Sequence, residues 1–119
     1  MTSPAVLVGL GGVLGAVARH LVGARIETDN ADTFAVNVLG SVALGLLVTL
    51  PLESGLSFVF ATGFCGAFTT FSSFAFETVR LYETGHRRRA IANAVGSLGA
   101  ALAGVALGAG LGSVLASTV

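Results

Sequence analysis

The chain has 119 residues, of which 54% are hydrophobic and 10% are charged, with a formal net charge of zero and a mean hydropathy of +0.90. Soluble domains carry roughly 25% charged residues, so a soluble fold of this length could not hide so much apolar surface. The zero net charge and the absence of lysine exclude a basic stripe for nucleic acid. The composition predicts an all-α protein of a cell membrane.

The few charges divide the chain into long uncharged runs at residues 1–18, 33–52, 54–76 and 90–119. Crossing about 30 Å of hydrocarbon takes about 20 helical residues. The first run lacks the positively charged start of a signal peptide, so it counts as a membrane helix. We therefore predict one transmembrane domain over residues 1–119, with helices at about 4–22, 33–50, 56–82 and 90–115.

The first two helices each carry one polar residue of interest. Arg19 lies near the end of helix 4–22, where its default is to extend to the interface, although it can also draw anions into a vestibule. Asn37 lies inside helix 33–50, which Pro51 stops. Its amide can donate to an anion or hydrogen-bond to another helix, and the residues alone leave both roles open.

The third helix is too long and too polar for a simple membrane span. As one straight helix, residues 56–82 would measure roughly 40 Å at about 1.5 Å per residue, and its glycines predict a break near 66–69. Glycines and hydroxyls crowd residues 63–74. Such groups are tolerated at membrane depth only beside protein or a water-filled cavity. We interpret this segment as a permeation or binding site.

Two phenylalanines of this segment, Phe71 and Phe74, share a helix face. Aromatic rings have positive edges, so two edges in a narrow space can stabilise a small anion without a fixed charge that would hold it too tightly. Filling a core is the ordinary alternative. A polar line at three- and four-residue spacing consists of Thr70, Ser73 and Glu77. It makes the anion site as well supported as the filled core. Carbonyls freed at the break would suit a hard cation.

The fourth helix, about 90–115, has a small residue at every fourth position: Ala92, Gly96, Ala100, Gly104, Gly108 and Gly112. Small residues allow helices to approach closely in lipid. Packing within one four-helix subunit explains most of them, but the length of this ridge suggests further partners. Asn93 and Ser97 lie near its start. Like Asn37, they can donate to an anion or hydrogen-bond to another helix.

No catalytic constellation stands out, so the sequence predicts that the protein is not an enzyme. The two histidines, His20 and His86, lack metal-ligand spacing with each other, with Cys65 or with a carboxylate. Both are expected at the membrane interface. The single cysteine excludes an intrachain disulfide, and its apolar surroundings predict a packed side chain.

The chain resembles the Fluc fluoride channels, also called CrcB proteins, over nearly its whole length. The most specific string is GFCGAFTTFSSF at residues 63–74, followed by Glu77. GGVLGAVAR at residues 11–19 and VNVLG at 36–40 support it. The resemblance implies a passive channel that exports cytoplasmic fluoride and so confers fluoride resistance.

The resemblance also implies an assembly and a set of site residues. The fold would be an antiparallel dual-topology-type dimer of four-helix subunits with a broken third helix, and each of its two pores would be built from both chains. The backbone carbonyls of Gly66 and Thr69 would hold a structural sodium ion that is not transported. Carried over by position, the pore residues would be Phe71, Phe74, Asn37, Thr70, Ser73 and Glu77.

The arginines predict one orientation in the membrane. With four helices, the first and third loops share one side, which holds Arg25 and residues 87–89, with Arg19 and Arg80 close by; the other side has no lysine or arginine. Arginine-rich loops stay cytoplasmic, so both termini are expected outside. A fixed orientation leads us to expect pairing with a homologous chain of opposite bias, while pairing of the chain with itself stays open.

Two other functions fit a small four-helix membrane protein. A small multidrug-resistance-type exporter of cations would need a membrane-embedded carboxylate, usually in its first helix, and residues 4–22 contain none. A structural membrane subunit without transport would not depend on Phe71 for fluoride resistance.

Overall fold

The computed structural model describes residues 3–27 and 31–118, and this part of the chain is helical between short connections. Four helical spans are long and apolar enough to cross a membrane. The prediction of an all-α protein with four transmembrane helices is confirmed. The elements are α1 (Pro4–Arg25), α2 (Ala31–Thr49), α3 (Ser54–Leu56), η1 (Ser57–Cys65), α4 (Gly66–Phe68), α5 (Phe71–Glu83) and α6 (Arg87–Ser117).

The third span, Ser54–Glu83, is interrupted as predicted. Thr69 (ψ 159°) and Thr70 (φ −146°, ψ 112°) are extended, and they separate α4 from α5. The break therefore lies at the end of the predicted interval rather than at its glycines. Before it, η1 is wound as a π-helix over nine residues, a feature that was not predicted and that often accompanies functional sites.

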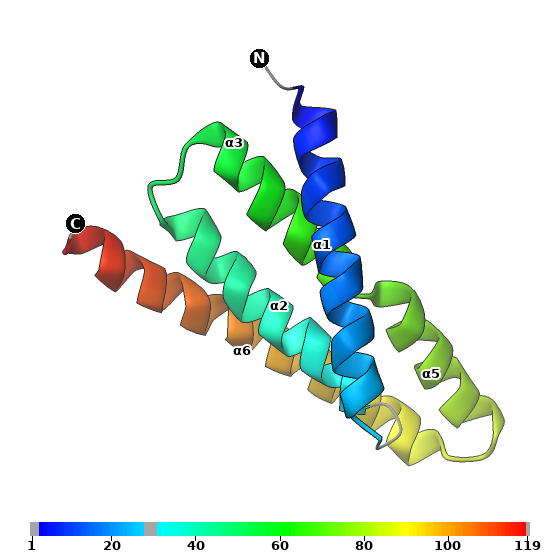
Figure 1. The fold of residues 1–119 in the computed structure, drawn as a ribbon. Coiled ribbons are helices and arrows are strands. Elements are labelled where there is room, and N and C mark those ends of the chain that lie inside the picture. Colours follow the sequence, from blue (N-terminus) through cyan, green and yellow to red (C-terminus); the bar gives the residue numbers. More distant parts are fainter. Residues whose placement is uncertain (1–2, 28–30, 119) are drawn as a thin grey trace.

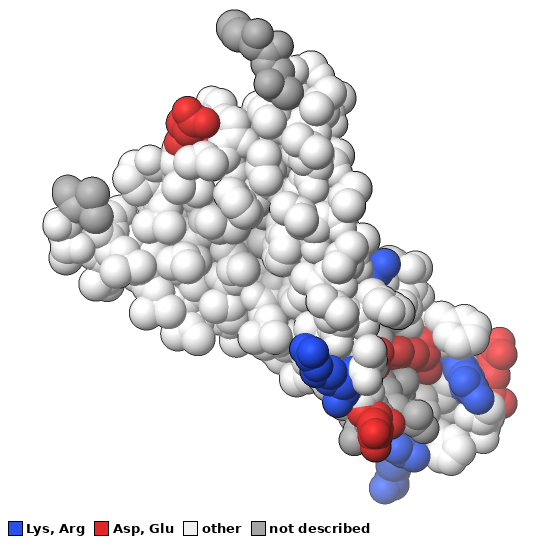
Figure 2. Space-filling model, in the orientation of Figure 1, with Lys and Arg blue, Asp and Glu red and all other residues white. Residues whose placement is uncertain are grey.

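Helix ends extend beyond the predicted bounds where the chain is charged. α1 continues to Arg25 and α6 begins at Arg87, because arginine is a good helix former and these ends lie outside the uncharged runs. In Figure 2 the charged side chains of this face gather mainly at the end where α5 joins α6, while a wide uncharged band covers the other elements. This distribution suits a protein whose middle lies in lipid.

The helices pack as two main pairs. α2 lies along α6, and α1 crosses η1 and α4 (Figure 1). Beyond the break, α5 turns away from α1 and packs on α6. The start of α1, the end of α6 and the α2–α3 connection lie at one end of the molecule, and the α5–α6 connection lies at the other. The break is thus positioned between the two pairs.

Glycines set the close approach of α1 to η1. A Cβ atom added to Gly11 would overlap the carbonyl oxygen of Val59, and one added to Gly15 would overlap the carbonyl oxygen of Phe64. One added to Gly63 would lie 2.5 Å from the oxygen of Val8. Backbone meets backbone here, so a side chain has no room unless the helices separate.

We expect Gly11→Ala to destabilise the protein, because overpacking costs about 1–3 kcal/mol. Gly9→Ala on the same helix is the matched control, since a Cβ there meets nothing within 4 Å. The measurement is the thermal unfolding midpoint of each variant in detergent. A midpoint for Gly11→Ala equal to that of Gly9→Ala would contradict this account of the α1–η1 contact.

The small-residue ridge of α6 is divided between two environments. Gly104, Gly108 and Gly112 face α2, where a Cβ on Gly108 would overlap the oxygen of Val42 and one on Gly112 would overlap the hydroxyl of Thr49. Gly96 lies on the same ridge, yet a Cβ there meets nothing within 4 Å in the described part of the chain. Intrasubunit packing accounts for the C-terminal half of the ridge only.

Candidate functional site

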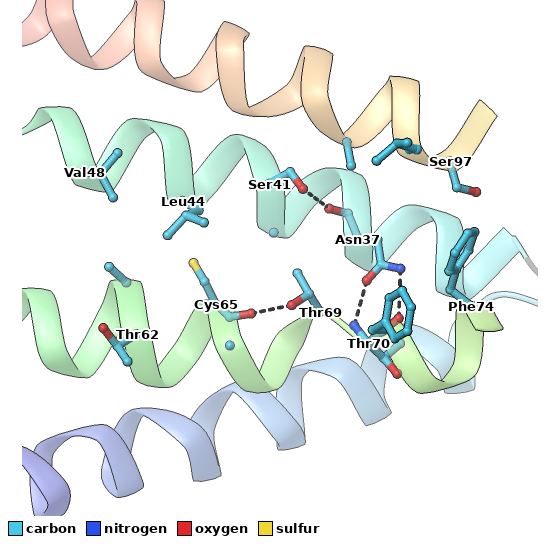
Figure 3. Close-up of a pocket in the computed structure, with 16 residues that line it drawn as sticks. Asn37, Ser41, Leu44, Val48, Thr62, Cys65, Thr69, Thr70, Phe74 and Ser97 are labelled. Carbon is cyan, nitrogen blue, oxygen red and sulfur yellow. Dashed lines mark hydrogen bonds between the residues drawn. The ribbon is translucent and has the colours of Figure 1, made fainter. Parts of the chain in front are cut away.

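A groove of about 580 Å³ opens beside the break, between α2, the third span and α6 (Figure 3). We call it the break groove. It is apolar beside Leu44, Val48 and Ala61 and becomes polar at Asn37 and Thr70. Its lining consists of Asn37, Gly40, Ser41, Leu44, Val48, Ala61, Thr62, Cys65, Gly66, Thr69, Thr70, Phe71, Phe74, Ser97, Leu98 and Ala101.

The two phenylalanines predicted to act together lie together at one end of the break groove. Their ring centroids are 5.9 Å apart and the ring planes are inclined by 51°. Phe71 is 78% exposed, so it does not fill the core of this subunit. An aromatic side chain left open in a groove at membrane depth is available to a ligand or to a second chain.

Asn37 spans from α2 to the break and pairs with the main chain of Thr70. The Thr70 N–H donates to Asn37 Oδ1 at 2.7 Å, and Asn37 Nδ2 donates to the Thr70 carbonyl at 3.0 Å (Figure 3). Of the two roles left open by the sequence, the structure therefore supplies the contact between helices. Ser41, one turn further along α2, donates to the Asn37 carbonyl at 2.6 Å.

A side chain also takes up the Ser73 amide, while the Thr69 amide keeps its helical backbone acceptor. The Thr70 hydroxyl accepts from the Ser73 N–H at 3.2 Å and caps α5. The Thr69 N–H and hydroxyl both donate to the Cys65 carbonyl, at 3.1 and 2.9 Å. In a continuous helix the Thr70 and Ser73 amides would instead donate to the carbonyls of Gly66 and Thr69. Those two carbonyls lose their helical donors here.

The remaining predicted site residues lie apart from the break groove. Ser73 and Arg19 line a second, more polar cavity of about 520 Å³, together with His20 and Asp32. Glu77 lines neither cavity, and its carboxyl accepts a hydrogen bond of 2.7 Å from the hydroxyl of Thr33. The polar line along α5 is thus split between two neighbours of that helix.

Thr33 is a buried polar residue that the sequence analysis missed, with 6% of its surface exposed. A signal was present: Thr33, Asn37 and Ser41 follow each other at four-residue spacing, which places them on one face of α2. Thr33 and Asn37 hydrogen-bond to the third span, and Ser41 donates to the Asn37 carbonyl within α2. This face of α2 is a polar line that matches the one on α5.

The other polar residues singled out in the sequence have local partners. Asn93 of α6 donates to the Thr78 hydroxyl of α5 at 2.8 Å, so it joins two helices, and Ser97 lines the break groove. His86 lies 3.1 Å from the Thr84 hydroxyl, and Cys65 is buried. Among the described residues, histidine, cysteine and carboxylate side chains form no cluster of three suited to a metal ion.

Comparison with known proteins adds an independent finding. Residues 6–109 match the family model described as CrcB-like protein, Camphor Resistance (CrcB). The chain is 50% identical over 111 residues to fluoride-specific ion channel FluC 2 of Natronomonas pharaonis, covering 93% of this chain and 96% of the relative. It is 48% identical over 107 residues to fluoride-specific ion channel FluC 2 of Haloarcula marismortui, covering 88% and 90%. A FluC 1 channel of Halobacterium salinarum is 43% identical over 115 residues, covering 95% and 90%.

Proposed function

This chain belongs to the CrcB family, and we propose that it is a multi-pass membrane channel that conducts fluoride selectively and passively. The matched family covers most of the chain, and the similar proteins named above carry the name of fluoride-specific ion channels. The single structural observation that carries the proposal is the Phe71–Phe74 pair, with Phe71 exposed, at a groove beside a helix break. In acidified surroundings part of the fluoride is a neutral weak acid, which crosses the membrane and ionises in the cytoplasm. Such a channel lets the trapped anion leave.

The chemistry of the break groove suits a small anion. The positive edges of Phe71 and Phe74 can stabilise a partly dehydrated fluoride ion, and neither ring carries a full charge that would trap it. The hydroxyl of Thr70 offers a donor in the break groove. In the second cavity, the hydroxyl of Ser73 offers another donor, and Arg19 raises the local concentration of anions through its field. Glu77, oriented by Thr33, would lie beyond the phenylalanines in this polar track.

A second chain would complete the pore, as an antiparallel partner that is another copy or a homologous chain of opposite orientation. Three features support this assembly. Phe71 is open to its surroundings, and a Cβ added to Gly66 or to Gly96 meets nothing within 4 Å of the described chain. Glycines at membrane depth that pack on nothing within their subunit are typical of helix interfaces. Two such chains would form two grooves and so two pores.

A structural sodium ion fits the break, and it is not the transported ion. The carbonyls of Gly66 and Thr69 are those whose helical amide donors are bonded elsewhere, to Asn37 and to the Thr70 hydroxyl. Carbonyl oxygens are suitable ligands for a hard cation at an unwound membrane helix. The ion, bound by these carbonyls from both subunits, would neutralise their dipoles and join the two breaks.

The arginines support a fixed orientation of this chain. Arg87, the first residue of α6, lies over the Tyr82 ring at 5.0 Å, beside the α5–α6 connection. Placing this end in the cytoplasm puts both termini outside. The exporter alternative finds no comparable support, because α1 carries no carboxylate and Glu77 is hydrogen-bonded to Thr33.

Growth of a fluoride-sensitive bacterial strain tests the proposal. Expression of this chain is expected to restore growth in millimolar fluoride and to leave sensitivity to a lipophilic cation such as ethidium unchanged. Protection against ethidium without protection against fluoride would favour the exporter. Failure to protect against either, with the chain present in the membrane, would require a test with its homologous partner.

A further inference from the structure

Asn37 uses both ends of its amide on one residue of the break. Its Oδ1 accepts from the Thr70 N–H and its Nδ2 donates to the Thr70 carbonyl. We propose that Asn37 and the Thr70 hydroxyl are positioning residues that divert two backbone amides and so keep the carbonyls of Gly66 and Thr69 available to the cation. This inference rests on the proposed function, because it assigns a cause to the sodium site of that channel.

The register of the helix shows which carbonyls are affected. An α-helical carbonyl accepts from the amide four residues later, so the partner of Gly66 would be Thr70 and the partner of Thr69 would be Ser73. The Thr70 amide is bonded to Asn37 instead, and the Ser73 amide is bonded to the Thr70 hydroxyl. Both carbonyls are therefore released by side chains that replace them as acceptors.

The surroundings of the break stabilise this exchange of hydrogen-bond acceptors. Thr70 is 7% exposed, and an unpaired amide or carbonyl in such a place is costly. On the same helix as Asn37, Gly40 leaves the space that the Thr69 methyl group occupies, since a Cβ there would overlap it. Helix α2 thus contacts both extended residues of the break. Asn37 hydrogen-bonds to Thr70, and Gly40 leaves room for the side chain of Thr69.

The amide of Asn37 makes both bonds at once because it carries one acceptor oxygen and a donor NH₂ group. An aspartate would place an oxygen against the Thr70 carbonyl, and a leucine of similar size would offer neither donor nor acceptor. Without an acceptor on α2, the Thr70 amide has the Gly66 carbonyl as its nearest alternative along the helix. Asn37→Leu is therefore expected to close the break toward a continuous helix and to withdraw the Gly66 carbonyl from the cation.

The test measures how strongly sodium stabilises the purified protein. The thermal unfolding midpoint is followed in detergent as sodium chloride replaces choline chloride at constant ionic strength, and the sodium concentration that gives half of the stabilisation is compared. Loss of residues that orient metal ligands lowers metal affinity by about 10–100-fold, so Asn37→Leu and Thr70→Val should each raise this concentration at least about tenfold. Thr70→Ser keeps the hydroxyl and should restore the value of the unmodified chain.

Asn93→Leu is the matched control, because Asn93 also joins two helices but bonds to Thr78, away from the break. It should lower the midpoint at every sodium concentration and leave the half-stabilising concentration unchanged. If Asn37→Leu does not fold, the half-stabilising sodium concentration of Thr70→Val still tests the inference.

Two results would overturn the inference. One is unchanged sodium dependence in Asn37→Leu and Thr70→Val together with lost fluoride flux, which would make these residues donors to the anion only. The other is a thermal unfolding midpoint of the unmodified chain that does not change with sodium concentration. Fluoride flux through the unmodified chain, measured on the same preparation, decides separately whether the proposed channel itself stands.

Discussion

Replacement of Phe71 by isoleucine is expected to lower fluoride efflux from proteoliposomes by about two- to tenfold, because an aromatic contact is worth about 0.5–1.5 kcal/mol beyond its area. Isoleucine keeps an apolar side chain in the break groove but has no positive edge for a dehydrated anion. Phe71 is 78% exposed and lies 5.9 Å from Phe74, ring centre to ring centre. Its loss should therefore affect transport far more than folding.

Phe76→Ile is the control for this substitution. Phe76 lies on the same helix, α5, and is 66% exposed, but it does not line the break groove. Its replacement should leave fluoride efflux close to that of the unmodified chain, with equal amounts of both variants in the membrane. Equal fluoride efflux from Phe71→Ile and Phe76→Ile would contradict a role for the Phe71 ring edge in permeation.

Introducing a large side chain at Gly66 is expected to prevent assembly of the dimer while sparing the fold of the subunit. A Cβ at Gly66 meets nothing within 4 Å of the described chain, although this residue lines the break groove. The open space is where the proposed partner would pack. Overpacking costs about 1–3 kcal/mol at each site, and Gly66→Leu places two such sites in one dimer.

Gly110→Leu is the matched control, since Gly110 is also open and exposed but lies outside the break groove. The measurement is the mass of the purified protein in detergent by native mass spectrometry. The unmodified chain and Gly110→Leu should give dimers, and Gly66→Leu should give monomers with helical circular dichroism intact. Dimers of undiminished stability in Gly66→Leu would place the interface elsewhere.

Charge spacing predicted the four spans because lipid forbids irregular backbone and tolerates few charges. The break was predictable for the same reason: residues 56–82 are too long and too rich in glycine and hydroxyls for one straight helix. Its position was less certain, because Gly66 continues the helix and the extended residues are Thr69 and Thr70. Tertiary contacts from α2 decide that position.

Periodicity identified residues that share a helix face, but it could not say which helix each face meets. Phe71 and Phe74 were expected together and lie together. Ser73 and Glu77 were expected with Thr70, yet Ser73 faces the cavity beside Arg19 and Glu77 bonds to Thr33. The pairing of Asn37 with the Thr70 main chain links residues 33 positions apart, and no local pattern encodes such a contact.

The central claim is tested most directly by fluoride efflux from proteoliposomes that contain this purified chain. A fluoride electrode records the ion outside the vesicles after a potassium ionophore relieves the charge, and chloride-loaded vesicles serve as the control. The account predicts rapid loss of fluoride and retention of chloride. Loss of both anions would contradict selectivity, and retention of fluoride even after co-reconstitution with an oppositely oriented homologous chain would contradict the channel itself.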